Sequence, residues 1–300
     1  MKVLLAQFNP IVGDLIGNAN RLKIICKDAA RNNADLVVTP ELSLWGYPAK
    51  DLLLSPYYLE KQKQALEGII KAIQLEEKNI SILIGIAEKI EDNFSPNLFN
   101  SVVLASKNGY EIVARKQLLP EYDVFEEKRY FRPGEHDNCI HLKVNKENWC
   151  IGLTICEDIW VDSKVQTQRI HGPDPIEKLI PKKIDLLINL SASPFSQEKI
   201  KQRKFLGRKA VERLNCPFIY INQVGGNDEL IFDGSSFVLN KSAETISSLQ
   251  SCQEDFKLWD TENIKKSNLP INLNPKEELF KALVLGTRDY ASKCGFKSAL

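Results

Sequence analysis

The 300-residue chain has no apolar run that approaches the roughly 20 residues needed to cross a bilayer. Its first ten residues hold one Lys and a short apolar run, which fits a first β-strand better than a signal peptide. An excess of one charge is also missing, because 40 Lys and Arg face 39 Asp and Glu. An even balance gives no reason to expect nucleic acid or an anionic membrane as a partner. We therefore expect a cytoplasmic protein that binds neither.

The seven cysteines form no Cys-x-x-Cys pair, and none lies at zinc-site spacing from a histidine. Reduced and mostly buried thiols are therefore expected, without a metal. His136, His141 and His171 stand in no nucleophile-like setting, although the sequence leaves open a Cys–His pair formed in space. Glycine loops that cradle phosphate (Gly-x-Gly-x-x-Gly or Gly-Lys-Ser/Thr) are absent as well.

Short apolar strands alternate with amphipathic helical stretches along most of the chain. This pattern favours a mixed sheet, or two packed sheets, with helices outside. Beyond about Ser247 the chain becomes polar, and residues 255–275 are interpreted as an extended connector before a last helix at 276–293. The expected strands are 3–8, 36–39, 80–87, a hairpin of 101–105 with 111–115, 149–155, 185–190, 218–222 and 231–239, and the expected earlier helices are 18–33, 57–77 and 197–215.

Cys156 ends the apolar run 149–155 and is followed at once by Glu157 and Asp158. A strand that ends in a sharp turn can present a side chain outward beside unpaired backbone N–H groups, as an acyl-transfer nucleophile requires. The alternative is that Cys156 is one more buried thiol. The two carboxylates favour the functional interpretation without deciding it.

Two further residues follow predicted strands. Glu41 comes after the buried strand 36–39, where α/β proteins place functional groups, and its alternative is a helix cap or a solvated carboxylate. Lys116 follows the strand 111–115, and a lone lysine is more often on the surface. The loop after it interleaves aromatic and charged residues from Tyr122 to Phe131, which indicates either a pocket lining or an anchored surface loop. The basic run 199–204 is interpreted as a solvated helix face.

Taken together in chain order, these segments resemble the nitrilase (carbon–nitrogen hydrolase) superfamily over roughly residues 1–250. Glu41 in Pro-Glu-Leu-x-Leu-x-Gly-Tyr, Lys116 in Arg-Lys-x-x-Leu-Pro and Cys156 in Ile-Cys-Glu-Asp-Ile-Trp are similar to its Glu–Lys–Cys triad. Each fragment alone is weak, but several in order are specific. The other matching fragments are Tyr-Phe-Arg-Pro-Gly at 130–134, Asn-Leu-Ser-Ala-Ser-Pro at 189–194, Asn-Gln-Val-Gly-Gly at 222–226 and Phe-Asp-Gly-Ser-Ser at 232–236.

Within that superfamily the chain resembles the N-terminal glutaminase domain of the glutamine-dependent NAD synthetase family. Trp-Gly-Tyr-Pro at 45–48, the segment 122–131, and Leu-Val-Leu-Gly-Thr-Arg-Asp-Tyr at 283–290 carry this likeness. The resemblance divides the chain into a glutamine amidohydrolase domain (1–250), a connector (251–275) and the start of a missing synthetase domain (276–300). It implies an α/β fold of two mixed β-sheets flanked by helices, an αββα sandwich that assembles into homo-oligomers.

The resemblance also implies roles for single residues. Cys156 is the expected nucleophile, Glu41 the general base and Lys116 the oxyanion donor, with Glu127 and Glu157 in support. Lys199 stands where some relatives carry Arg, and a lysine cannot clamp a carboxylate with two parallel hydrogen bonds. No cofactor is expected for this half-reaction, whereas ATP and Mg²⁺ belong to the missing domain. The expected glutamine-binding residues are Tyr47, Tyr122, Phe125, Ser193 and Lys199, besides Glu127.

Two other functions stay open at this point. A stand-alone amidase of the same superfamily, acting on another small amide, would keep the triad and change the pocket. A non-catalytic assembly module would have no need for all three triad groups. The tail at 283–290 argues against the first and the intact triad argues against the second.

Overall fold

The computed structural model describes residues 1–92, 94–135, 138–162, 172–262 and 274–298. His136 and His171, and residues 263–273 of the expected connector, lie outside the described residues. The helices of four turns or more are α1 (Leu15–Arg31), α2 (Pro56–Gln74), α4 (Lys199–Leu214) and α5 (Pro275–Lys293), and α3 (Pro175–Leu179) is a single short turn. None of these helices is long and apolar enough to span a membrane, within the part of the chain that is described.

Fourteen strands lie in the described residues, and they form two six-stranded sheets and one separate hairpin. The first sheet has the order β14-β1-β2-β3-β4-β5 and the second has the order β13-β12-β9-β8-β7-β6. Both sheets are mixed. In the first, β1, β2 and β3 run parallel while β4, β5 and β14 are antiparallel to their neighbours. In the second, β7, β8 and β9 run parallel while β6, β12 and β13 are antiparallel to theirs. The strands are β1 (Lys2–Gln7), β2 (Leu36–Val38), β3 (Ser81–Lys89), β4 (Leu98–Ser106), β5 (Gly109–Arg115), β6 (Cys139–Val144), β7 (Glu147–Ile155), β8 (Leu186–Ser191), β9 (Phe218–Asn222), β10 (Val224–Asn227), β11 (Leu230–Asp233), β12 (Phe237–Leu239), β13 (Thr245–Ser248) and β14 (Asp255–Asp260).

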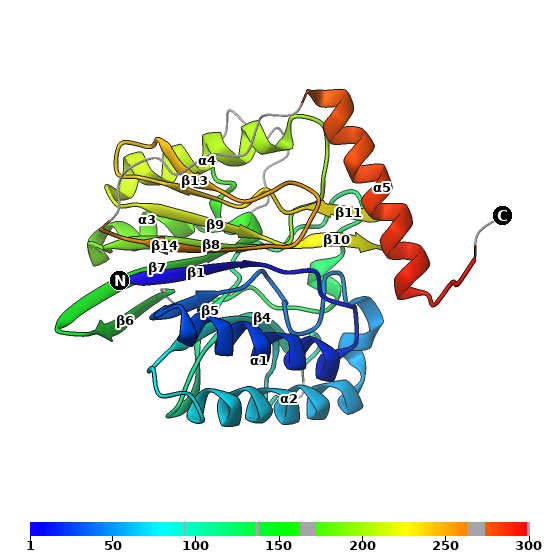
Figure 1. The fold of residues 1–300 in the computed structure, drawn as a ribbon, viewed down its shortest axis with the longest axis horizontal. Helices are drawn as coiled ribbons and strands as arrows, with labels where there is room; N and C mark the ends of the chain where they lie inside the picture. The colour runs from blue at the N-terminus through cyan, green and yellow to red at the C-terminus, as the bar shows by residue number, and fades with distance from the viewer. Residues whose placement is uncertain (93, 136–137, 163–171, 263–273, 299–300) are drawn as a thin grey trace.

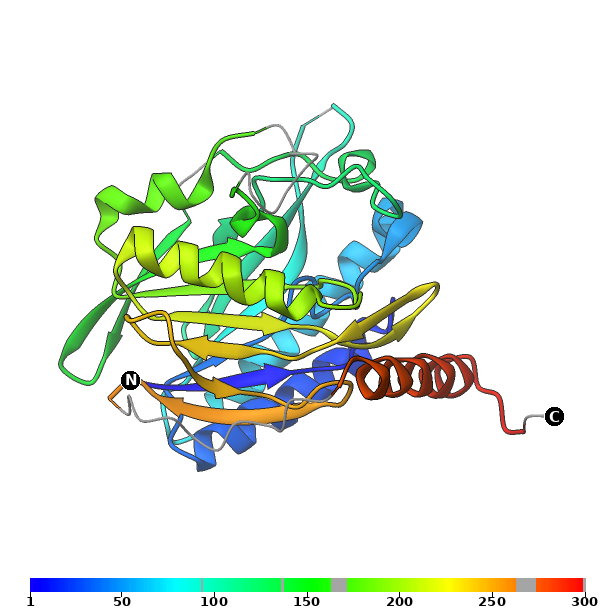
Figure 2. The ribbon, with the colours of Figure 1, turned by 90° about the horizontal axis from the view of Figure 1, so that it is seen from above.

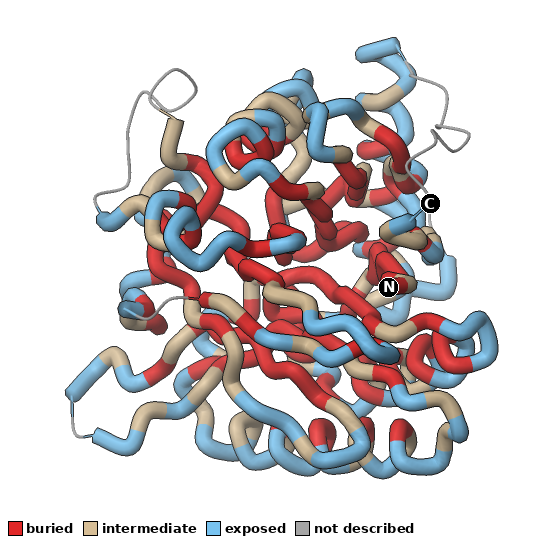
Figure 3. Tube along the Cα trace, turned by 90° about the vertical axis from the view of Figure 1, so that its left-hand side faces the viewer, coloured by how far each residue is buried: buried red, intermediate tan, exposed pale blue. Residues whose placement is uncertain are grey.

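The two sheets pack face to face, with α1 and α2 outside the first sheet and α3 and α4 outside the second (Figures 1 and 2). The core between the sheets takes alternate residues of each strand, such as Val3 and Leu5 from β1 and Leu186 and Ile188 from β8. The residues between them, such as Leu4 and Leu187, face the helices. Buried residues therefore run through the middle of the molecule (Figure 3). The expected α/β sandwich of two mixed sheets flanked by helices is confirmed.

One strand prediction needs correction. The expected strand 231–239 is divided into β11 and β12, because Gly234 and Ser235 adopt left-handed backbone conformations with φ of 65° and 55°. β11 then pairs with β10 in the separate hairpin, while β12 joins the second sheet. β10 itself contains Gly225 and Gly226.

The first part of the expected connector belongs to the first sheet. Asp255–Asp260 forms β14, which pairs antiparallel with the whole of β1 and buries Trp259. The polar composition of this segment does not predict a strand. β14 lies at the edge of its sheet with one neighbouring strand, so it can remain partly exposed, as Phe256 and Leu258 are. The last helix also packs on the domain: α5 lies against β10 and β11, and Asp289 accepts from the backbone N–H of Gly226 at 2.9 Å.

Candidate active site

Cys156 lies at the point where β7 leaves the second sheet and turns into a 3₁₀ helix, Cys156–Ile159. Its φ of 45° is left-handed, a conformation that costs a non-glycine residue roughly 1–3 kcal/mol and is typical of functional sites. Asp158 holds the turn, since one of its carboxylate oxygens accepts from the backbone N–H of Ile155 at 2.9 Å. Its other oxygen accepts from the backbone N–H groups of Gln117 and Leu118. Asp158 therefore fixes the cysteine turn to the segment that carries Lys116.

Glu41 follows β2 and is almost fully buried, at 1% exposure. One carboxylate oxygen accepts from Lys116 Nζ and from Asn100 Nδ2, both at 2.7 Å. The other accepts from the backbone N–H of Ala192 at 3.0 Å. Gly85 of β3 makes room for this loop, because a Cβ there would stand 2.1 Å from the backbone nitrogen of Leu42. Glu41 is thus held by both sheets.

Lys116 follows β5 and is also 1% exposed. Its Nζ lies 2.7 Å from an oxygen of Glu41 and 2.7 Å from an oxygen of Glu127. Burial alone would lower the pKa of Lys116, but the Glu127 and Glu41 carboxylates outweigh it and raise the pKa well above its ordinary value. Lys116 is therefore a permanent cation between two buried carboxylates.

The Cys156 side chain is buried and shares the electrostatic environment of the same three groups. Burial and the Glu41 carboxylate raise the pKa of the Cys156 thiol well above its ordinary value, against the opposing effect of Lys116. The resting site therefore holds a neutral thiol. A base must take its proton as it reacts, and Glu41 is the candidate base in this environment.

Glu127 and Glu157 each have one carboxylate oxygen engaged. The hydroxyl of Tyr47 donates to Oε1 of Glu127 at 2.8 Å, and the hydroxyl of Tyr122 donates to Oε1 of Glu157 at 2.9 Å. The Oε2 atoms of both glutamates are buried and have no hydrogen-bond partner among the described residues. Burial raises the pKa of Glu127 to about 7 and also raises the pKa of Glu157. Two acceptors are thus available to N–H groups of a substrate.

The other expected substrate-binding residues lie in three settings. Phe125 packs its ring against those of Tyr47 and Tyr122, with centroids 6.3 and 5.5 Å apart. Ser193 is buried behind β8, and its hydroxyl accepts from Arg203 at 3.2 Å. Lys199 begins α4 with its Nζ over the ring of Trp160, and burial lowers its pKa while nearby Glu157 opposes this. The ten candidates therefore lie on loops, on 3₁₀ turns and at the start of α4. Ser193 is buried with the others, at 3% exposure.

Three positioning residues were not among the candidates. Asp158 was noted only as a carboxylate after the strand, and Asn100 lies on β4 with no motif around it. Arg203 is fully buried, so the run 199–204 is not entirely a solvated helix face. Its spacing with Leu206, Gly207 and Ala210 puts it on the buried side of α4.

The Arg203 guanidinium pairs with the Asp233 carboxylate at 2.8 Å and donates to the carbonyl oxygens of Ser193 and Pro194. We expect Arg203→Met to lower the free energy of unfolding by about 3–5 kcal/mol, because Asp233 becomes a buried and unpaired charge. Chemical denaturation with urea measures this. Arg208→Met, on the exposed side of the same helix, is the matched control and should stay within about 0.5 kcal/mol. Equal losses in both variants would show that the buried pair has no special weight.

Residues 2–256 match the family model described as carbon-nitrogen hydrolase. The chain belongs to this family. It is 39% identical over 308 residues to the glutamine-dependent NAD(+) synthetase of Synechocystis, covering 99% of this chain and 54% of that protein. The solved glutamine-dependent NAD+ synthetase of Acinetobacter baumannii superposes with a TM-score of 0.82 and 31% identity, over 97% of this chain and 52% of that one.

A Nesterenkonia amidase of the nitrilase superfamily matches with a TM-score of 0.68 at 18% identity, over 97% of both chains, which supports the fold alone. This carbon-nitrogen hydrolase chain spans about half the length of the synthetases that it resembles. The expected family relationship is therefore confirmed, and it covers the hydrolase half of those proteins.

Proposed function

We propose that the chain hydrolyses the side-chain amide of glutamine through a thioester on Cys156. The observation that carries this proposal is the buried Glu41–Lys116–Glu127 cluster, with both carboxylates 2.7 Å from Lys116 Nζ, next to a neutral and strained cysteine. A buried cation between two carboxylates has a high desolvation cost, and residues of an ordinary core would be apolar. The cluster has the composition that acyl transfer requires: a nucleophile, a base and an oxyanion donor.

In the first half-reaction Glu41 takes the proton of the Cys156 thiol while the sulfur attacks the amide carbon. Lys116 Nζ and the backbone N–H of Glu157 stabilise the negative charge on the carbonyl oxygen, and one such donor is typically worth about 3–4 kcal/mol. Protonated Glu41 then gives its proton to the leaving nitrogen, so that the C–N bond breaks and ammonia departs. The acyl group remains on the sulfur as a thioester.

In the second half-reaction water replaces ammonia. Glu41 takes a proton from the water as it attacks the thioester carbon, and the C–S bond breaks to release glutamate. The proton on Glu41 returns to the sulfur and restores the neutral thiol. Every proton in this cycle passes through Glu41, and each step uses side-chain and backbone groups alone.

Glutamine recognition is assigned to the groups around the two free carboxylate oxygens. Glu127 Oε2 and Glu157 Oε2 would accept hydrogen bonds from substrate N–H groups, and Lys199 would meet the substrate carboxylate. Tyr47, Tyr122 and Phe125 would pack against the aliphatic part, with Ser193 behind them. A buried acceptor that stays unpaired is costly, so an amide without the matching N–H groups would bind poorly.

Glutamine should be preferred over simple amides by on the order of 100-fold or more in kcat/KM, because they leave these acceptors unpaired. An assay of ammonia release with glutamine, butyramide and a carbamoyl amine measures the ratio. Better turnover of butyramide would make the chain a general amidase.

A glutamine-like diazo-ketone distinguishes an enzyme from a non-catalytic assembly module. Stoichiometric labelling of the chain that is lost in Cys156→Ser requires a working nucleophile.

The relatives carry a synthetase portion beyond the hydrolase half, and we infer that this domain is the consumer of the ammonia. ATP and Mg²⁺ would serve that domain, where nicotinic acid adenine dinucleotide accepts the nitrogen. Residues 276–300 would begin it, although α5 packs on the hydrolase domain through Asp289 and Lys293. A homo-oligomer and a cytoplasmic location stay predictions.

A further inference from the structure

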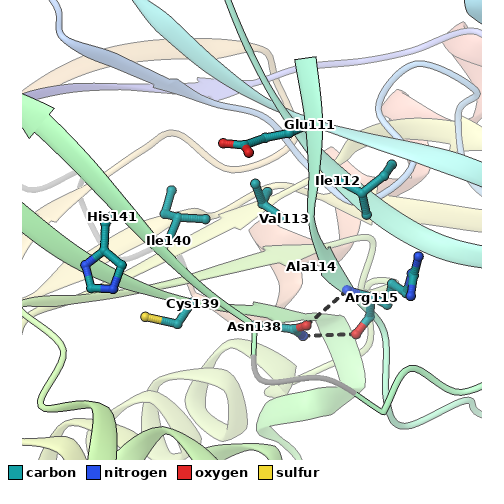
Figure 4. A pocket seen from close by; sticks show the side chains of 9 residues that line it. All are labelled: Glu111, Ile112, Val113, Ala114, Arg115, Asn138, Cys139, Ile140 and His141. Atoms are coloured by element: carbon teal, nitrogen blue, oxygen red, sulfur yellow. Dashed lines mark hydrogen bonds between the residues drawn. The ribbon is translucent and has the colours of Figure 1, made fainter.

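Three sulfur and nitrogen ligands gather on the β6–β7 hairpin, at the edge of the second sheet and away from the triad. The register pairs His141 of β6 directly with Cys150 of β7, and Cys139 with Gly152. Residues 139, 141 and 150 therefore lie on one face of the hairpin. Figure 4 shows Cys139 and His141 on the same side of β6, with Ile140 on the other.

The donor atoms of this cluster are close together. The sulfur atoms of Cys139 and Cys150 lie 3.1 Å apart, and both lie with a ring nitrogen of His141 within 4.8 Å of one another. The two cysteines are half-buried and the histidine is exposed. Because His141 is exposed, the cluster is reachable from solvent on this face of the hairpin. A cavity of about 640 Å³ lies between β5 and β6.

We propose that Cys139, His141 and Cys150 bind a zinc ion, with water as the fourth ligand. Two thiolates and one imidazole match the preference of Zn²⁺ for sulfur and nitrogen, and two thiolates neutralise its charge. Each thiol gives its proton to solvent on binding. The site is new to the sequence interpretation, which found no cysteine at zinc-site spacing from a histidine, because the strand register rather than the spacing brings Cys150 across.

The geometry favours a metal over a disulfide. Sulfur atoms bound at about 2.3 Å to a tetrahedral zinc lie roughly 3.8 Å apart, so the pair at 3.1 Å has to open by under about 1 Å. A disulfide needs sulfur atoms about 2.0 Å apart, which is a larger movement in a hairpin whose backbone register is fixed. A disulfide also gives no role to His141, whereas a zinc ion uses all three groups.

The ion would join the edge strand β6 to β7, the strand that carries Cys156 at its far end. Cys150 is six positions before Cys156 and packs against the apolar cluster on the helix side of the second sheet. The expected effect is therefore on stability: binding to the folded chain alone raises the midpoint of thermal unfolding. The inference is independent of the proposed glutaminase activity.

The test is a titration of the phosphine-reduced chain with Zn²⁺ in competition with a chromophoric chelator, under argon. We expect one equivalent bound, and Co²⁺ in its place should show thiolate-to-cobalt charge-transfer absorption. Cys150→Ser should weaken zinc binding by on the order of 100-fold or more. Loss of a residue that only hydrogen-bonds to a metal ligand already lowers metal affinity about 10- to 100-fold, and Cys150 is itself a ligand. His141→Ala should weaken it as well.

Cys294→Ser, which removes the exposed thiol after α5, is the matched control and should leave binding unchanged. Equal affinity in the parent and in Cys150→Ser would overturn the proposal, as would less than one equivalent in the reduced parent. A disulfide between Cys139 and Cys150 would also overturn the proposal. In that case the parent binds no zinc and loses the mass of two hydrogens in air, and Cys150→Ser abolishes this mass loss.

Discussion

Replacing Cys156 with alanine should lower kcat for glutamine hydrolysis by at least about 10⁴-fold, the range seen when a covalent nucleophile is removed. In the proposed mechanism the thioester forms only on this sulfur, and neither Glu41 nor Lys116 can take its place. Water attack assisted by the remaining groups would supply only the residual rate. Ammonia release under saturating glutamine measures kcat, and intact mass after the diazo-ketone reports the lost adduct.

The main alternative cause of such a loss is a disturbed turn, because Cys156 has a left-handed φ of 45° that alanine also adopts at a cost. Cys156→Ser keeps a polar atom at the site and should be similarly inactive, which separates chemistry from packing. Cys252→Ser, at another cysteine with a left-handed φ of 60°, is the matched control and should retain activity. A kcat for Cys156→Ala within about tenfold of the parent would place the nucleophile elsewhere.

The fold class and most of the strands could be predicted from the sequence because the signals are local. Apolar runs such as 36–39 and 149–155 end in polar residues at the point where the strands leave their sheets. Local chemistry left Cys156 as one thiol among seven. The ordered motifs around Glu41, Lys116 and Cys156 made it a candidate, and the fold now places these residues in one buried environment.

The positioning residues could not be predicted in the same way, because their partners depend on strand register. Asn100 lies 59 residues after Glu41 in the chain. It reaches Glu41 only because β4 pairs with β3 in the sheet. Asp158 and Gln117 meet across the two sheets. The position of β14 depends on pairing with β1, which no local pattern specifies.

The charges around Cys156 decide which form of its side chain is present before the reaction. Lys116 alone would favour the thiolate, but its Nζ lies 2.7 Å from an oxygen of Glu41 and 2.7 Å from an oxygen of Glu127. Burial and the Glu41 carboxylate therefore raise the pKa of Cys156 in the resting site. The thiol must be deprotonated at the moment of attack, which places more of the reaction on Glu41 than a preformed thiolate would.

Glu41→Gln should accordingly lower kcat by about 10²- to 10⁴-fold with little change in KM, since general-base catalysis is worth this much and glutamine binding uses other groups. The amide has the size of the carboxylate, and its oxygen can still accept from Asn100 at the present position. It cannot accept a proton from Cys156 or from water, so both half-reactions slow. Initial rates across a range of glutamine concentrations separate kcat from KM.

Glu88→Gln is the matched control, because Glu88 is another largely buried carboxylate of the first sheet that pairs with a cation, Arg115. Its loss removes an ion pair but no base, so kcat should stay within about tenfold of the parent. An equal loss of kcat in both variants would attribute the Glu41 effect to the sheet rather than to proton transfer. A loss in Glu41→Gln alone, with the diazo-ketone still able to mark Cys156, would show that the nucleophile is present and lacks its base.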